Sequence, residues 1–293
     1  MEHKDILNLL EESGLGAYKE RLSPYIFTSA KLHLQPEQED NAPVGVTKVG
    51  GRPDLPEDFE WPRWKKYNLS FIAQVNLSEM PKAQASPLPC GGLLSFFYAV
   101  EALYEYDAEF YGDPRTCRVI YTGPQDLMNL KRRELPSQLA QEGILKPNRV
   151  TFTADVCVPA PESAYLESMG LGWNGNQEEF EKYWSVFLQQ FMDRMQPGRY
   201  VNRLLGHPEQ IQGDMQVWCE MMTEGTYHEE LNREESKRMA DSALRWRLLL
   251  QIDSEEEKTG IMWGDVGRIY FWIREDDLAA CRFDRAVCIM QDS

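Results

Sequence analysis

Hydrophobic and polar residues alternate along several stretches of the chain, a pattern typical of half-buried β-strands. Ala30, Leu32 and Leu34 alternate with polar neighbours, and residues 150–158 alternate in the same way. Apolar runs bounded by Gly and Pro predict further strands. These are expected at 69–77, 92–101, 118–121, 246–252, 266–273 and 286–290.

Helical periodicity is strongest over residues 177–195, where apolar side chains recur at i, i+3, i+4 and i+7. Asn176 is the expected N-cap, and Glu179 stands three residues later in the capping-box position. Weaker helical patterns cover residues 4–22, 125–142 and 227–244, and Pro136 interrupts the second of these.

Three short signals occur twice in the same order: Gly-x-Pro, then Gln-apolar-Asn/Asp-x-x-Glu, then Gly-x-Leu/Ile-x-Phe-aromatic. We interpret them as two copies of one strand-rich unit, although a chance match within strand-rich segments is the alternative. The first copy of the signals occupies 51–53, 74–79 and 92–97, and the second occupies 206–208, 251–256 and 267–272.

Strands with inserted helices and no regular β-α-β alternation predict an α+β fold. We expect mainly antiparallel sheets built from two related halves by internal duplication. The whole chain, 1–293, is expected to form a single domain. Within it we place half-repeat one at about 44–123, a helical insert at about 124–198 and half-repeat two at about 200–293.

The charge of the chain is strongly negative and unevenly distributed. The net charge is -16, divided as -4 over residues 1–150 and -12 over residues 151–293. Such a field repels nucleic acid and anionic lipid and attracts a basic protein, although acidity can also serve solubility alone. No apolar run is long enough to cross a membrane, and the first residues do not resemble a signal peptide. We therefore expect a cytoplasmic protein.

Motifs that would carry chemistry are weak. Residues 170–175 match G-x-G-x-x-G, but a dinucleotide site needs a strand directly before the glycines. The four histidines do not cluster, so no metal site is evident, and there is no nucleophile elbow or P-loop. We expect no catalytic residue, no cofactor and no metal, and hence no enzyme, with an enzyme of unrecognised type as the open alternative.

Acidic clusters are the remaining signal, and they are candidates for a partner-binding surface. Glu230 and Glu234 are one helical turn apart and would share a face. The alternative is an ordinary solvated surface. The candidate residues are Glu178, Glu179, Glu229, Glu230, Glu234, Glu235, Glu255, Glu256 and Glu257.

Several separated motifs resemble the YwqG-like family of bacterial proteins, over roughly residues 25–290. The resemblance implies an α+β fold and a cytosolic location but no reaction and no catalytic residue. Members often resemble accessory or immunity proteins encoded near polymorphic toxins. The motifs are Val49–Pro53, Ser70–Asn76, Gly92–Phe97, Leu204–Met215, Trp246–Asp253 and Trp263–Phe271. The Gln of each copy, Gln74 and Gln251, is expected to be buried and to satisfy backbone groups at a sheet edge.

The leading functional hypothesis is therefore a non-enzymatic binding protein, most concretely a cytosolic immunity protein. It would neutralise a cognate bacterial toxin encoded nearby, such as a basic nuclease, by covering its substrate surface. The alternative is a small-ligand sensor or carrier with a cleft between the two halves. Four loop tryptophans are candidates to line that cleft: Trp61, Trp64, Trp173 and Trp263.

Overall fold

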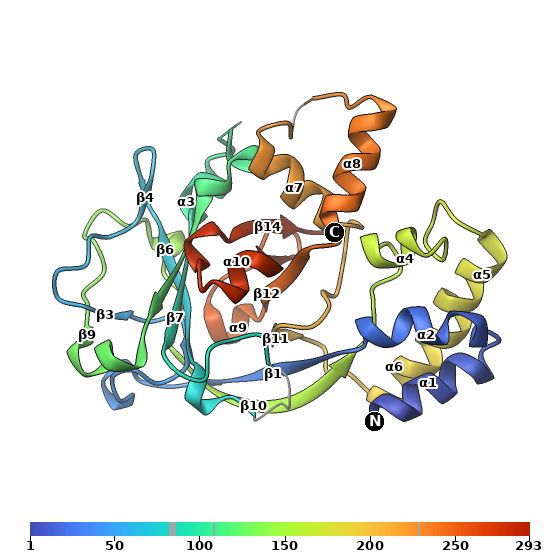
Figure 1. Cartoon of the computed structure of the whole chain (residues 1–293). Coiled ribbons are helices and arrows are strands. Elements are labelled where there is room, and N and C mark those ends of the chain that lie inside the picture. The colour runs from blue at the N-terminus through green and yellow to red at the C-terminus, as the bar shows by residue number, and fades with distance from the viewer. Residues whose placement is uncertain (82–85, 108, 228) are drawn as a thin grey trace.

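One ten-stranded sheet forms the centre of the molecule (Figure 1). The computed structural model describes residues 1–81, 86–107, 109–227 and 229–293. The strand order is β14-β13-β12-β11-β1-β10-β2-β6-β7-β8, and neighbouring strands are antiparallel throughout. The strands are β1 (Phe27–Pro36), β2 (Lys48–Val49), β6 (Ser70–Asn76), β7 (Leu93–Tyr98), β8 (Cys117–Thr122), β10 (Asn148–Cys157), β11 (Asn202–Leu204), β12 (Trp246–Asp253), β13 (Arg268–Arg274) and β14 (Val287–Gln291). The predicted α+β class with antiparallel sheet is confirmed.

The sheet curls so that its two ends meet around a shared core. In Figure 1, β6 and β7 lie opposite β12 and β14, and the long strands β1 and β10 run beneath them. The rings of Phe96 in β7 and Phe271 in β13 are 5.1 Å apart. The Cys117 thiol of β8 donates to the Ala286 carbonyl beside β14 at 3.4 Å. Apolar side chains from both halves thus form one continuous core.

The four strands on either side of the central β1–β10 pair correspond in order and in detail. β6 and β12 each contain a register shift, at Ile72 and at Leu249 respectively. The carbonyl at each shift accepts a bond from a positive-φ residue: Gly50 donates to Ile72 at 2.8 Å, and Leu205 donates to Leu249 at 3.0 Å. These correspondences match the predicted half-repeats, whose common origin stays a prediction.

In each half, the Gly-x-Pro segment and the Gln of the repeated signals lie together. The Gln side chain bonds to one backbone group before the strand that precedes Gly-x-Pro and to one directly after Gly-x-Pro. The Gln74 side chain accepts from the Asp54 amide at 2.9 Å and donates to the Val46 carbonyl at 2.8 Å. The Gln251 side chain accepts from the Glu209 amide at 2.9 Å and donates to the Val201 carbonyl at 2.6 Å. Both glutamines are buried, as expected, but they hold the segments flanking the inner strands β2 and β11 and not a sheet edge.

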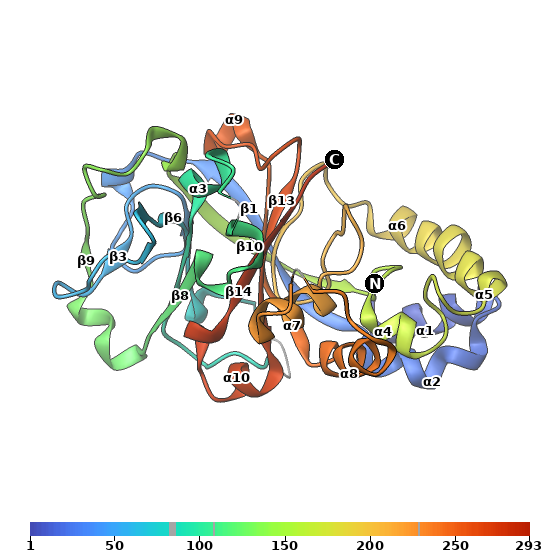
Figure 2. The ribbon, with the colours of Figure 1, turned by 90° about the horizontal axis from the view of Figure 1, so that it is seen from above.

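Two groups of helices lie outside the curl of the sheet (Figure 2). One group packs together at the far end of β1 and β10, and the other covers the outer face of β12–β14. The first group comprises α1 (His3–Glu12), α2 (Lys19–Leu22), α4 (Ala164–Ser168), α5 (Gln177–Glu181), a π-helix (Lys182–Leu188) and α6 (Gln189–Met195). The second comprises α7 (Gln216–Glu224) and α8 (Arg233–Ala243).

The remaining elements are short. They are the helices α3 (Val100–Tyr104), α9 (Glu256–Thr259) and α10 (Glu275–Ala279) and the two-residue strands β3 (Asp54–Leu55), β4 (Arg63–Trp64), β5 (Tyr67–Asn68) and β9 (Lys131–Arg132). Among the residues that the structure describes, no helix combines the length and apolar character needed to cross a bilayer.

Three helix predictions need correction. The helix over 177–195 exists, and Asn176 caps it by accepting from the Glu178 and Glu179 amides, but its middle is a π-helix. The helix expected at 227–244 begins only at Arg233, because Asn232 supplies its cap. Residues 125–142 form 3₁₀ turns and β9 instead of a helix. The segment 124–198 therefore holds β9 and β10 as well as helices.

Candidate functional site

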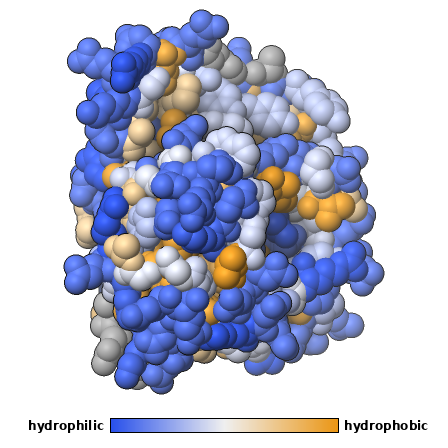
Figure 3. Space-filling model, turned by 90° about the vertical axis from the view of Figure 1, so that its right-hand side faces the viewer, coloured by the Kyte–Doolittle hydropathy of each residue, from blue (hydrophilic) through white to orange (hydrophobic). Residues whose placement is uncertain are grey.

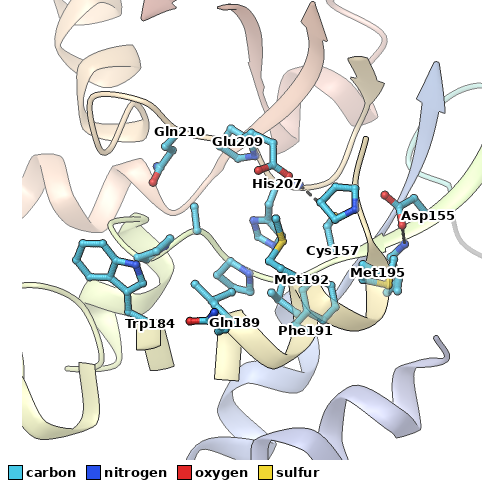
Figure 4. Close-up of a pocket in the computed structure, with 18 of the residues that line it drawn as sticks. Asp155, Cys157, Trp184, Gln189, Phe191, Met192, Met195, His207, Glu209 and Gln210 are labelled. Carbon is cyan, nitrogen blue, oxygen red and sulfur yellow. Dashed lines mark hydrogen bonds between the residues drawn. The ribbon is translucent and has the colours of Figure 1, made fainter. Parts of the chain in front are cut away.

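A groove of about 480 Å³ separates the π-helix and α6 from the segment 203–210 (Figure 4). The end of β10 forms its inner wall, and residues 158–161 complete it. Figure 4 shows α6 on one side and Glu209 and Gln210 on the other, with Asp155 and Cys157 at the inner end.

The helical wall of the groove is apolar and partly uncovered. Trp184, Leu188, Phe191 and Met192 all line it. Trp184 is 47% exposed, although its ring packs edge-on against Phe180 at 5.4 Å. A π-helix adds a residue to the turn and is frequent at functional sites. Figure 3 shows the side of the molecule on which α1, α5 and α6 lie. Hydrophilic side chains cover most of it, and hydrophobic ones form separate patches. Trp184 and Met192 thus present neighbouring exposed apolar surface in the groove.

The opposite wall contains a buried ionic cluster. The side chain of Arg203 in β11 is 6% exposed and donates to the His207 carbonyl at 2.6 Å. Its guanidinium lies 3.3 Å from the Glu209 carboxylate and 3.7 Å from that of Asp155. One cation thus serves two carboxylates, and Asp193 adds a third acidic group to the lining. The groove is therefore acidic as well as apolar.

His207 and Cys157 lie behind this cluster, and both are held uncharged. The His207 ring is buried, stacks on Phe27 with centroids 4.5 Å apart, and donates from Nε2 to the Tyr25 carbonyl at 2.7 Å. Burial lowers the pKa of His207 to about 3, so the imidazole is neutral at pH 7. The Cys157 thiol accepts from the His207 amide at 3.2 Å, and burial raises its pKa. A protonated thiol is a poor nucleophile, so Cys157 is not activated for covalent chemistry.

Comparison with family models supplies a classification. A model described as a domain of unknown function, DUF1963, matches residues 47–291. The chain belongs to the DUF1963 family. The curated proteins contain no match to it. The matched region spans both half-repeats and the groove, so the site lies within the part that this DUF1963 protein shares with its family.

The structure divides the predicted acidic surface of this DUF1963 protein among separate elements. The acidic residues fall in the first turns of α5, α8 and α9 and in the loop before α8. These helices lie apart in both views (Figures 1 and 2). Acidic residues in a first turn stabilise the helix dipole, which accounts for the clusters without a partner.

Individual members of that predicted set also have local roles. Glu178 and Glu179 both pair with Lys182, at 2.9 and 3.0 Å. Glu235 completes a capping box with Asn232. Glu255 is buried and accepts from the Asn202 side chain at 2.7 Å. It is therefore a structural residue rather than part of an exposed surface. Glu229, Glu230, Glu234, Glu256 and Glu257 are exposed.

The structure also shows where the other candidate motifs lie. Residues 170–175 follow the helix α4 rather than a strand, as expected for a glycine-rich turn. Within the described residues, no three His, Cys, Asp or Glu side chains gather in a way that could hold a metal ion. The four tryptophans proposed for a cleft are not brought together. Trp64 and Trp263 are buried in the core and Trp61 packs against it, whereas Trp173 is exposed.

Sequence reasoning missed the groove because its parts are distant along the chain. Asp155, Trp184, Arg203 and Glu209 come from four segments that only the fold unites. One signal was available: Arg203 stands directly before the apolar pair Leu204 and Leu205, in a short segment that begins at Val201 and is buried in the structure. A charged residue within a buried strand needs a partner, and so it marks an ionic site.

Proposed function

We propose that the protein is a non-enzymatic binding protein that holds a basic segment of a partner protein in the groove beside α6. The observation that carries the proposal is the meeting, in one groove, of uncovered apolar side chains, Trp184 and Met192, with three carboxylates. The carboxylates are Asp193 on α6, Asp155 at the end of β10 and Glu209 on the opposite side. An amphipathic segment with one large apolar side chain and flanking Lys or Arg complements this lining.

The most specific version is an immunity protein that neutralises a basic toxin, such as a nuclease, encoded nearby. Its support is the YwqG-like resemblance together with the net charge of -16. The carboxylates of α5, α8 and α9 would then supply a long-range field that speeds encounter, and the groove would supply affinity. A cytoplasmic location belongs to the same proposal.

The decisive experiment uses the purified product of the neighbouring reading frame and isothermal titration calorimetry. We expect Trp184→Ala to weaken binding by about 30-fold, since a central aromatic anchor contributes about 2 kcal/mol. Trp173→Ala is the matched control, because Trp173 is exposed in the same helical region but outside the groove. Reversing the charge of Glu229, Glu230, Glu234 and Glu235 should slow association and leave dissociation unchanged, which calorimetry would record as a weaker affinity. Undiminished affinity of Trp184→Ala would remove the groove from the proposal.

A small-ligand carrier is the second candidate. A cavity of about 610 Å³ has residues of both halves in its walls, including Met80 and Pro87 from the first and Leu205 and Leu278 from the second. Its size and mainly apolar lining are typical of ligand sites. A thermal-shift screen of metabolites tests this candidate, and a screen without any stabilising compound would count against it.

A further inference from the structure

A second, smaller cavity of about 190 Å³ lies between the two halves. Five aromatic residues line it: Tyr98, Phe110 and Tyr111 from the first half, and Trp218 and Tyr227 from the second. Cys288, Ile289 and Met290 of β14, with Gln212, complete the lining. None of these described lining residues carries a formal charge at pH 7. For comparison, an apolar cavity of about 150 Å³ in another protein holds benzene.

Tyr98 differs from the other buried tyrosines. Its side chain is 1% exposed. The hydroxyls of Tyr67, Tyr165, Tyr183 and Tyr270, which are buried to a similar degree, each donate to an acceptor at 2.6–2.8 Å. Among the described residues, the Tyr98 hydroxyl has no such acceptor, and Tyr98 lines the cavity. The Tyr98 oxygen is not one of the fully enclosed unpaired atoms among the described residues, so it can be reached from the cavity. An acceptor supplied by a ligand there would take its hydrogen bond.

The hydroxyl can act only as a neutral group at physiological pH. Burial raises the pKa of Tyr98 well above its ordinary value, so the phenol keeps its proton and can donate it. The aromatic walls favour a flat ring, since offset and edge-to-face contacts stabilise aromatic pairs. The lack of charged groups in the described lining disfavours an ionic ligand, whose desolvation would be uncompensated.

From this geometry we infer that the cavity is a binding site for a neutral, single-ring aromatic compound whose carbonyl oxygen accepts a hydrogen bond from Tyr98. This site is separate from the groove beside α6, and the inference does not depend on the function proposed for that groove. The site is also separate from the cavity of about 610 Å³ of the carrier hypothesis, with which it shares no lining residue among those described.

Benzamide is the probe, and toluene is the control ligand that lacks an acceptor. Binding is measured on the full chain by calorimetry and by tryptophan fluorescence, with Trp218 as the reporter in the cavity wall. We expect benzamide to bind the wild type, and Tyr98→Phe to bind it about tenfold more weakly, the value of one hydrogen bond. Toluene should bind both proteins equally. Tyr183→Phe is the matched control: it removes an equally buried hydroxyl that bonds to Pro159, and benzamide binding should be unchanged.

Stability provides a second measurement. Tyr98→Phe removes an unpaired hydroxyl and should keep or raise the melting temperature, whereas Tyr183→Phe breaks a hydrogen bond and should lower it. The inference is overturned if benzamide at millimolar concentration does not bind the wild type. That result would mean that the cavity holds only water. Equal benzamide affinity in Tyr98→Phe also overturns it. Trp184→Ala should leave benzamide binding intact, which separates this site from the groove.

Discussion

Lys48 in the first half and Arg203 in the second half occupy corresponding positions in β2 and β11. Each buried cation donates to the backbone carbonyl four residues later, Lys48 to Arg52 at 2.5 Å and Arg203 to His207 at 2.6 Å. The two halves therefore place a buried cation in the same local frame. What surrounds that cation differs between the halves.

In the first half the cation is sealed. The Asp54 carboxylate is 0% exposed, lies 3.7 Å from Lys48, and receives a 2.6 Å hydrogen bond from Arg132 of β9. Glu39 closes the cluster with ion pairs to both cations, at 3.0 and 3.3 Å. Two cations and two carboxylates are thus matched in a closed site.

In the second half the corresponding cluster opens into the groove. Glu209 corresponds to Asp54, but its side chain is 29% exposed. Arg203 is the one cation among the described residues that forms ion pairs with both Glu209 and Asp155. No second cation among the described residues takes the place that Arg132 has in the first half. The comparison shows that one framework carries a closed ion-pair cluster in the first half and an open one in the second. In the function proposed above, a partner's Lys or Arg would take the place of the second cation.

The largest expected effect separates the sealed cluster from the open one. We expect Asp54→Asn to lower the free energy of unfolding by about 3 kcal/mol, because it leaves Lys48 and Arg132 buried with one carboxylate. Glu209→Gln should cost only about 1 kcal/mol, since water reaches that side chain and Asp155 still pairs with Arg203. Urea unfolding of both variants measures the difference. Equal costs would contradict the distinction between the two clusters.

Acid offers a second check on the sealed cluster around Asp54. Burial acts to raise the pKa of Asp54, but the Arg132 hydrogen bond and the Lys48 charge outweigh it and hold the pKa below its ordinary value. A depressed carboxyl pKa contributes stability above the unfolded value of about 3.9, and that contribution is lost as the pH falls through the folded value. The difference between wild type and Asp54→Asn should therefore narrow below about pH 4.

A smaller effect tests whether the two halves are equivalent where they look alike. Gln74→Leu and Gln251→Leu each leave one backbone amide and one carbonyl without a partner, so each should destabilise by about 2 kcal/mol. Gln74→Leu also removes a 2.7 Å hydrogen bond to the Asp54 carboxylate, which keeps its bonds from Arg132 and the Gly45 amide. Equal values in chemical unfolding would support the common plan of the half-repeats. A difference of more than about 1 kcal/mol would show that the surroundings outweigh the shared hydrogen bonds.

Local rules explain which parts of this structure were predictable. The alternation in β1 and β10, the cap at Asn176 and the paired glutamines depend on neighbours along the chain or on a repeated motif. The π-helix was not predictable, because its apolar spacing over seven residues resembles that of an α-helix. The groove was not predictable either, since Arg203 meets Asp155 only through the position of β11 in the sheet. The role of the acidic clusters stays a prediction, because residues that stabilise helix starts and residues of a docking surface look alike in sequence.

The smallest expected effect concerns the open half alone. Trp184→Ala should change the free energy of unfolding by no more than about 0.5 kcal/mol, because nearly half of the side chain already contacts water. Trp263→Ala is the contrast: that indole is buried in the main core, and its loss should cost about 3 kcal/mol or more. Chemical unfolding compares the two variants. A binding residue is one whose removal weakens the complex without weakening the fold, so a large destabilisation by Trp184→Ala would reassign Trp184 to the core and leave the groove without its anchor.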